Sequence, residues 1–177
     1  MPKIISLGRI AGLKVSARPS VLIGFLILWI LLSSAIYWLM RFPIEVALAG
    51  GFAGAWLHYA SGLWHHLSHA LAARQSGYPM AGIVYSWFLA ISRYPSHEGE
   101  LPARTHIQRA LGGPAGSLAL AIVLTILALV LRPSGSMLWW LVTFAAADSL
   151  LVFTLGSLLP LGFTDGSTLL YWLGRRN

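Results

Sequence analysis

Residues 46–73 read VALAGGFAGAWLHYASGLWHHLSHALAA. The stretch is apolar and rich in glycine and alanine, and it is longer than the roughly 20 residues that a helix needs to cross a bilayer. Its last third carries three closely spaced histidines and a serine. Polar groups at that depth are costly and usually functional. The stretch therefore predicts a transmembrane helix with a functional site near one end.

Three further apolar stretches flank this one, at residues 20–40, 114–131 and 137–159. The whole chain is 57% hydrophobic and 10% charged, with a mean hydropathy of +0.73. These values exclude a disordered chain, and the absence of cysteine excludes a disulfide-stapled secreted domain. The predicted fold class is an all-α polytopic membrane protein of about four transmembrane helices. We expect one membrane-embedded domain over residues 1–177.

The chain carries 12 basic and 5 acidic residues, a formal net charge of +7. The basic residues lie between the apolar blocks, so they indicate orientation in a bilayer and not binding to nucleic acid. Only Arg41 and Arg132 fall in the two short turns of one side, and the other ten lie on the opposite side. The positive-inside bias predicts that both termini and the long central loop are cytoplasmic.

Within the second stretch, His65 and His69 lie on one helix face about one turn apart, so both imidazoles can reach one metal ion. His58 lies roughly 10 Å further along the axis, which is too far to share that ion. It is expected to line the interior or to hydrogen-bond a neighbouring helix. His66 points about 100° away from His65. Spacing alone leaves open that the histidines are only the polar end of an amphipathic helix.

A metal site of this kind needs a third ligand, and the chain has only five carboxylates: Glu45, Glu98, Glu100, Asp148 and Asp165. Glu45 belongs to an external turn, and Glu98 and Glu100 are interpreted as a solvated charge run. Asp148 is expected near the outer end of the last span, far from the histidine pair. Asp165 is different, because a proline and two glycines interrupt the apolar run around it. The four-span topology brings it to the depth of the histidine pair.

Four segments together resemble the site-2 protease family of intramembrane metalloproteases. Residues 65–77, HHLSHALAARQSG, resemble its HExxH helix, with a departure at the second motif position. Residues 111–117, LGGPAGS, resemble the AGPxxN segment, and residues 157–166, SLLPLGFTDG, resemble NLLPxxPLDG. Residues 12–20, GLKVSARPS, are similar to the lead-in of a bacterial subgroup that has an extra N-terminal span. The resemblance covers nearly the whole chain and implies a bacterial cytoplasmic membrane.

The resemblance implies that His65, His69 and Asp165 bind Zn²⁺ and leave a fourth position for water. It also implies that position 66 holds the general base, which is glutamate in the family and His66 here. A neutral imidazole accepts a proton, but it adds no negative charge and is itself a metal ligand. The asparagines of the other two motifs are replaced by the shorter Ser117 and Ser157.

Residues 83–92, IVYSWFLAIS, are rich in β-branched and aromatic types, which predicts a strand or a small membrane-associated hairpin between the second and third spans. An aromatic interfacial loop is the alternative. In the family, a sheet near the metal is thought to pair with the unwound substrate. The expected partners are a transmembrane protein substrate or client and the lipid bilayer.

The sequence is compatible with three functions. The first is a zinc metalloprotease that cleaves within or beside a transmembrane helix. The second is an inactive pseudoprotease that binds or scaffolds membrane clients because His66 replaces the glutamate. A small transporter is disfavoured, since the chain has no inverted repeat. The sequence specifies neither the substrate nor the oligomeric state.

Overall fold

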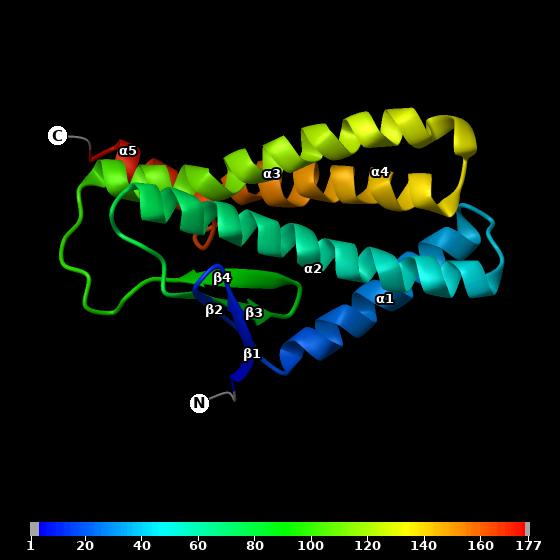
Figure 1. Ribbon diagram of the computed structural model, residues 1–177, viewed down its shortest axis with the longest axis horizontal. Coiled ribbons are helices and arrows are strands. Elements are labelled where there is room, and N and C mark those ends of the chain that lie inside the picture. Colours follow the sequence, from blue (N-terminus) through cyan, green and yellow to red (C-terminus); the bar gives the residue numbers. More distant parts are fainter. Residues whose placement is uncertain (1–3, 176–177) are drawn as a thin grey trace.

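The computed structural model describes residues 4–175. It is mostly helical, with a bundle of long helices and a small sheet beside one end (Figure 1). The helices are α1 (Ser20–Trp38), α2 (Ile44–Gln75), α3 (Ala103–Leu131), α4 (Met137–Leu150) and α5 (Asp165–Leu173). Short helical turns η1 (Arg132–Ser134), η2 (Leu151–Leu155) and η3 (Gly156–Leu158) join or extend them.

Three segments are long and apolar enough to cross a membrane: Ser20–Trp38, Ala103–Leu131 and Met137–Leu158. Helix α2 is not among them, so the expected count of four spans is not confirmed. It has 32 residues and is long enough to cross a bilayer, but its glycines, histidines and serines lower its mean hydropathy. Many of these small and polar residues are buried against neighbouring helices. The exposed apolar surface that could contact lipid therefore lies mainly on the helices around α2.

The sheet has four strands in the order β1-β2-β3-β4. Their bounds are β1 (Ile5–Ile10), β2 (Leu13–Ala17), β3 (Gly82–Ser86) and β4 (Leu89–Arg93). The β1–β2 and β3–β4 pairs are antiparallel, whereas β2 and β3 are parallel. A parallel pair needs a crossover connection, which α1 and α2 supply here. Strand β4 is left at one edge of the sheet.

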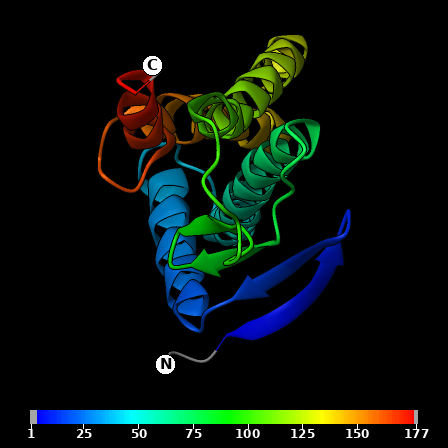
Figure 2. The same ribbon diagram turned by 90° about the vertical axis from the view of Figure 1, so that its left-hand side faces the viewer.

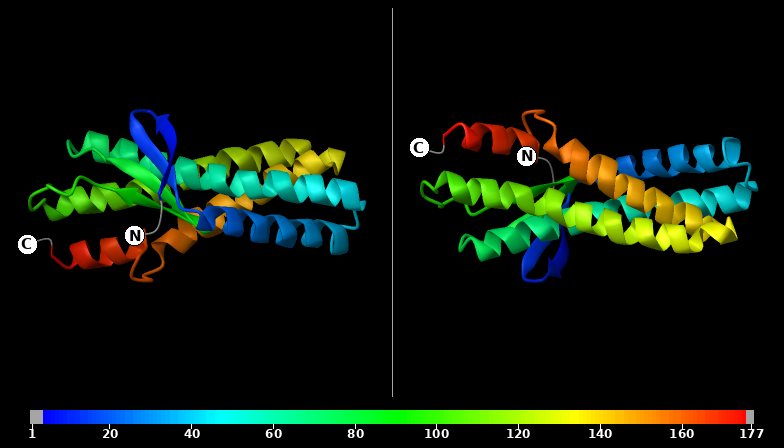
Figure 3. Two further views of the ribbon diagram at one scale, coloured as in Figure 1. Left: turned by 90° about the horizontal axis from the view of Figure 1, so that it is seen from below. Right: turned by 90° about the horizontal axis from the view of Figure 1, so that it is seen from above.

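The expected hairpin over 83–92 is present as β3 and β4, but the fold class of an all-α protein needs correction. The N-terminal segment, for which no strand was expected, forms β1 and β2 and completes the sheet. Figures 2 and 3 show the β1–β2 hairpin projecting away from the helices. Strand β2 alternates buried and exposed side chains at its start, as expected for a strand with one covered face.

The sheet is attached to the bundle through its inner strands. Buried Leu13, Val15 and Ile83 pack with Tyr59 and Ala73 of α2 in one apolar cluster. This packing lays the sheet beside the C-terminal half of α2, which is the half that carries the clustered histidines.

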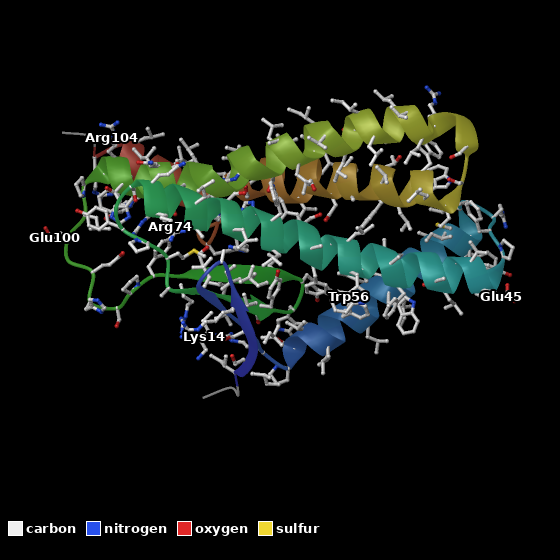
Figure 4. All side chains as sticks on the ribbon, viewed as in Figure 1. Lys14, Glu45, Trp56, Arg74, Glu100 and Arg104 are labelled. Atoms are coloured by element: carbon white, nitrogen blue, oxygen red, sulfur yellow. The ribbon has the colours of Figure 1, made fainter. Side chains whose placement is uncertain are left out.

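The charges are distributed unevenly along the molecule. Lys14, Arg74 and Arg104 lie at the end that carries the sheet, whereas Glu45 lies at the opposite end of the bundle (Figure 4). Two of the basic residues counted in the sequence, Lys3 and Arg176, lie outside the described residues. The described part of the chain thus has a basic end and a nearly uncharged remainder.

Candidate metal centre

The metal centre predicted from the sequence is assembled from three residues of two segments. His65 and His69 project from one face of α2, and their Nε2 atoms lie 3.0 Å apart. Asp165 adds its carboxylate, with Oδ2 3.3 Å from His65 Nε2 and Oδ1 3.3 Å from His69 Nε2. One ligand atom from each residue lies within 4.8 Å of the other two, close enough together to hold a metal ion. Both histidines are buried, and the aspartate is partly buried.

The chain reaches Asp165 through a sharp return after η3. The left-handed backbone of Gly162, with φ of +85°, turns the chain back, and the Ser167 hydroxyl accepts a hydrogen bond from its N–H at 2.7 Å. A side chain at Gly166 would collide with the carbonyl oxygen of Leu158. Glycines are therefore required on both sides of Asp165 for the carboxylate to point at α2.

Helix α3 closes the site from the other side by an unusually close approach to α2. A Cβ atom at Gly113 would collide with the Nε2 atoms of both His65 and His69. A Cβ at Gly112 would lie 2.6 Å from that of Ala72. Small residues at such a contact let two backbones approach. The glycine pair before Pro114 thus brings the α3 backbone against the tips of the imidazole rings.

The remaining ring nitrogens set the protonation of the two histidines. His69 Nδ1 lies 2.8 Å from the carbonyl oxygen of Arg109, which can only accept, and 3.1 Å from the backbone N–H of Gly113, which can only donate. The shorter contact, to the carbonyl, favours the tautomer with the hydrogen on Nδ1. His65 Nδ1 lies 3.0 Å from the Ser117 hydroxyl, which can accept in the same way. A neutral imidazole protonated on Nδ1 has a free lone pair on Nε2. Such outer hydrogen bonds orient metal-ligating histidines in general.

The centre of this cluster is therefore rich in acceptors. Two Nε2 lone pairs and a carboxylate face one another at 3.0 to 3.3 Å in a buried position. Lone pairs at that separation repel unless a cation or a proton lies between them. The donor set of two imidazoles and one carboxylate is that of catalytic zinc sites, which keep a fourth position open. The residues present thus fit a divalent metal ion.

Comparisons with known proteins agree with this geometry. No family model matches the chain. The sequence is similar to the protein named "Putative zinc metalloprotease Rip3" from two strains of Mycobacterium tuberculosis, with 33% identity over 185 residues. That alignment covers 100% of this chain and 45% of the relative, so the chain spans less than half the length of the curated relatives it matches.

The fold has a solved counterpart, the site-2 protease from Methanocaldococcus jannaschii. The TM-score is 0.64 at 18% sequence identity, over 99% of this chain and 73% of that chain. The chain is thus similar in sequence to a protein named as a zinc metalloprotease and shares its fold with a site-2 protease.

His66 occupies the position of the glutamate in the site-2 protease motif. His66 is 8% exposed, and its ring centroid lies 5.2 Å from that of His65 and 5.7 Å from that of His69. Its Nδ1 lies 2.9 Å from the Ser92 hydroxyl of β4. His66 therefore lies between the metal centre and the edge strand of the sheet, and it is not one of the three clustered ligands.

The two serines at the site-2 protease asparagine positions behave differently. Ser117 reaches the centre through His65. Ser157 instead donates to carbonyl oxygens of its own helical turn, those of Phe153 and Thr154, at 3.1 Å each. Only one of the two replaced asparagines thus has a polar counterpart that contacts a candidate ligand.

Two acidic residues lie in surroundings other than those expected. Glu98 does not belong to a solvated charge run, because both of its oxygens accept hydrogen bonds from the buried guanidinium of Arg109. Asp148 is far from the metal ligands, as expected, but it pairs with His58 in the interior of the bundle, with His58 Nδ1 at 3.0 Å from Oδ1. The expected hydrogen bond from His58 to a neighbouring helix is confirmed. Neither the partner of Glu98 nor that of Asp148 was expected from the sequence.

Proposed function

We propose that this protein is an intramembrane zinc metalloprotease that cleaves transmembrane segments of other membrane proteins. The observation that carries the proposal is the buried cluster of two imidazole lone pairs and one carboxylate. The relatives reported above support zinc as the metal. Bound Zn²⁺ would polarise the scissile carbonyl and lower the pKa of a water molecule at the open position.

Different residues of the chain bind the metal, orient its ligands and act as the general base. His65, His69 and Asp165 hold the metal, and Ser117 and the Arg109 carbonyl keep the two imidazoles in the correct tautomer. His66 is the proposed general base. Its Nδ1 is occupied by Ser92, so its Nε2 is the atom that takes the proton from the attacking water.

The proposed substrate contact is the free edge of β4. A peptide bond inside a helix is shielded by its own hydrogen bonds, so a transmembrane substrate must unwind before it is cleaved. Unwound backbone in a membrane needs new hydrogen-bond partners, and an open strand edge supplies them. Strand β4 lies next to His66, which supports this strand as the place where substrate adds.

A pseudoprotease is the second candidate, and it is favoured by one observation. The position of the family's glutamate carries His66, which adds no negative charge beside the metal. In that case the same site and strand bind a transmembrane client without hydrolysing it.

The proposed setting is a bacterial cytoplasmic membrane, with α2 as a fourth span. The buried side chains of α2 are mainly small or polar and face the neighbouring helices, so α2 can cross the membrane without high hydropathy along its whole length. The basic sheet end is then cytoplasmic (Figure 4). Single cysteines at Arg41 and Ser134 are expected to label from outside, and a cysteine at Glu100 only after permeabilisation. Outside labelling at Glu100 contradicts this orientation.

The decisive experiment is cleavage of a model transmembrane substrate by the purified, zinc-loaded protein. Asp165→Ala is the control, because it removes one ligand. Product formed by the parent and absent from Asp165→Ala supports the protease. A parent protein that retains zinc and captures the substrate uncleaved supports the pseudoprotease. A parent protein that neither cleaves nor captures the substrate contradicts both.

A further inference from the structure

The bundle contains a second histidine–aspartate pair that the metal centre does not use. His58 Nδ1 lies 3.0 and 3.2 Å from the two oxygens of Asp148, and the two residues are 6% and 7% exposed. The ring of Phe153 separates this pair from the metal centre, at 5.2 Å from the His58 ring and 5.8 Å from the His65 ring. The pair therefore has a purpose other than metal binding.

The hydrogen-bond partners of this pair require a shared proton. His58 Nε2 lies 2.8 Å from the carbonyl oxygen of Phe88, which only accepts, so Nε2 carries a hydrogen. His58 Nδ1 faces a carboxylate, and a second proton must lie between them for that bond to form. With that proton the pair has no net charge, which is the condition for burying it at low cost.

The Phe88 carbonyl belongs to the turn between β3 and β4. The neighbouring carbonyl, that of Trp87, accepts a hydrogen bond from the Tyr59 hydroxyl at 2.5 Å. Trp87 has a positive φ of 53°, and its carbonyl lies so close to α1 that a Cβ at Gly24 would be 2.6 Å away. Two adjacent residues of α2 thus hold the two carbonyls of the turn.

Strand β4 runs from this turn to the metal centre alongside α2, and it is tied to the helix at two points. One tie joins His58 to Phe88, and the other joins His66 to Ser92. Eight residues of helix between the histidines rise about 12 Å, and four residues of strand between their partners rise about 13 Å. The two spacings match, so fixing the turn also fixes which strand residue lies beside position 66.

We propose that His58 is a positioning residue that locks the β3–β4 turn to α2 and so sets the register of the β4 edge against the metal centre, while Asp148 balances the charge of the buried imidazole. The lock itself does not depend on any activity, whereas its consequence for substrate rests on the proposed function. A substrate segment added to a locked β4 presents its peptide bond at a constant distance from the metal ligands. A segment added to a loose β4 does not.

Two substitutions of His58 distinguish the bond to the Phe88 carbonyl, which forms the lock, from the bond to position 148, which joins α2 to α4. In His58→Gln the amide nitrogen takes the place of Nε2, so the bond to Phe88 is retained and the bond to position 148 is lost. In His58→Asn the amide nitrogen takes the place of Nδ1, so the opposite bond is retained. Both are made in an Asp148→Asn background, which removes the buried charge and leaves an amide that can still partner the residue at position 58.

The readout is the mobility of a spin label, which is easily placed because the chain has no cysteine. Leu89→Cys puts the label at the start of β4, where the side chain is 42% exposed. Leu7→Cys on the projecting β1 strand is the control position, 62% exposed. Zinc content of each variant in lipid nanodiscs verifies that the fold is retained.

The lock predicts that the label at position 89 becomes mobile in His58→Asn and stays immobile in His58→Gln, with no change at position 7. The reverse pattern, or equal mobility in both variants, overturns the proposal. Should His58→Asn fail to retain zinc, His58→Leu in the same Asp148→Asn background replaces it, because leucine fills the site without a donor for the Phe88 carbonyl. An immobile label at position 89 in that variant then overturns the proposal.

Cleavage measurements test the consequence separately. Displacement of the strand edge is expected to lower kcat/KM by about 10- to 100-fold in His58→Asn, and His58→Gln is expected to restore most of it. If the label responds as predicted and the parent protein cleaves nothing, the lock stands and the proposed protease function fails. If the parent cleaves and the label does not respond, the lock fails alone.

Discussion

The chain contains two histidine–aspartate clusters with opposite hydrogen-bond balance. In the metal centre, the outer nitrogens of His69 and His65 lie beside the Arg109 carbonyl and the Ser117 hydroxyl. Hydrogens on these outer nitrogens leave the inner nitrogens to face Asp165 as lone pairs. In the second cluster, both ring nitrogens of His58 face oxygen acceptors. The first cluster needs a metal ion in its centre, and the second needs only a proton. Outer partners, and not residue type, decide which cation a buried pair holds.

The largest expected difference between the clusters is in metal content. Asp165→Ala is predicted to lower zinc in the purified protein from about one ion per chain to nearly none, because two imidazoles alone make a weak site. Asp148→Ala removes the carboxylate of the other cluster and is predicted to leave zinc unchanged. Elemental analysis of detergent-purified protein measures both. Zinc retained in Asp165→Ala, or lost in Asp148→Ala, would contradict the claim that only the cluster containing Asp165 binds the metal.

The next largest effect is expected at position 66. If His66 is a poor replacement for glutamate, His66→Glu will raise the rate of transmembrane substrate cleavage by about 10²- to 10⁴-fold, the contribution of a well-placed general base. Single-turnover kinetics with equal zinc content isolate the chemical step. A lower rate in His66→Glu would mean that the imidazole is itself an adapted base, held in place by Ser92.

A smaller effect is expected from the outer partner of His65. Ser117→Ala removes the acceptor of its Nδ1 hydrogen and is predicted to weaken zinc binding by about 10- to 100-fold. Ser149→Ala is the matched control, because Ser149 is also fully buried but bonds to Ser61 away from the ligands. Titration with a competing chelator measures the affinity. Equal affinities in the two variants would show that Ser117 does not tune the site.

The sequence could predict the metal centre because its determinants are local. The pair His65 and His69 is a helix spacing, and the return that carries Asp165 is marked by Pro160, Gly162 and Gly166. The outer partners could not be predicted, because Ser117 and the Arg109 carbonyl reach the histidines only through the close packing of α2 and α3.

The second cluster did leave a signal in the sequence. Measured from the outer ends of the predicted spans 46–73 and 137–159, His58 and Asp148 lie about 18 and about 17 Å deep at 1.5 Å per residue. Two ionisable residues at equal depth are expected to pair. The expectation that Asp148 lies near the outer end of its span was wrong, because residue 148 lies at about the same depth as His58.

The sheet was harder to predict than the helices. Residues 83–92 have the composition of a hairpin, but β2 is only five residues long and pairs in parallel with β3 across the whole of α1 and α2. Such non-local pairing leaves no periodic signal in a short segment. The apolar stretches located all four long helices, α2 included. Helix α2 nevertheless falls short of the hydropathy of a membrane span, because the residues it packs against its neighbours are mostly small or polar.

The smallest predicted effect concerns the loop that follows β4 and contains Glu98. Hydrogen bonds from the Arg109 guanidinium lower the pKa of the Glu98 carboxyl below its ordinary value. The pair therefore stabilises the fold above the unfolded-state pKa of about 4.3, and that stabilisation is lost as the pH falls through the lower folded-state pKa.

Glu98→Gln is predicted to lower the free energy of unfolding at pH 7 by about 1 kcal/mol, because the carboxylate is partly exposed, so solvent screens the pair, and the glutamine amide oxygen can still accept from Arg109. The difference from the parent protein should vanish in strongly acidic buffer, where Glu98 is protonated in both states. Glu100→Gln is the matched control, because Glu100 forms no ion pair among the described residues. Denaturant unfolding in detergent at several pH values measures all three proteins. Since the Arg109 backbone also holds His69, a simultaneous loss of zinc affinity in Glu98→Gln would show that the loop and the metal centre are coupled, and unchanged affinity would show that the metal centre is independent of the loop.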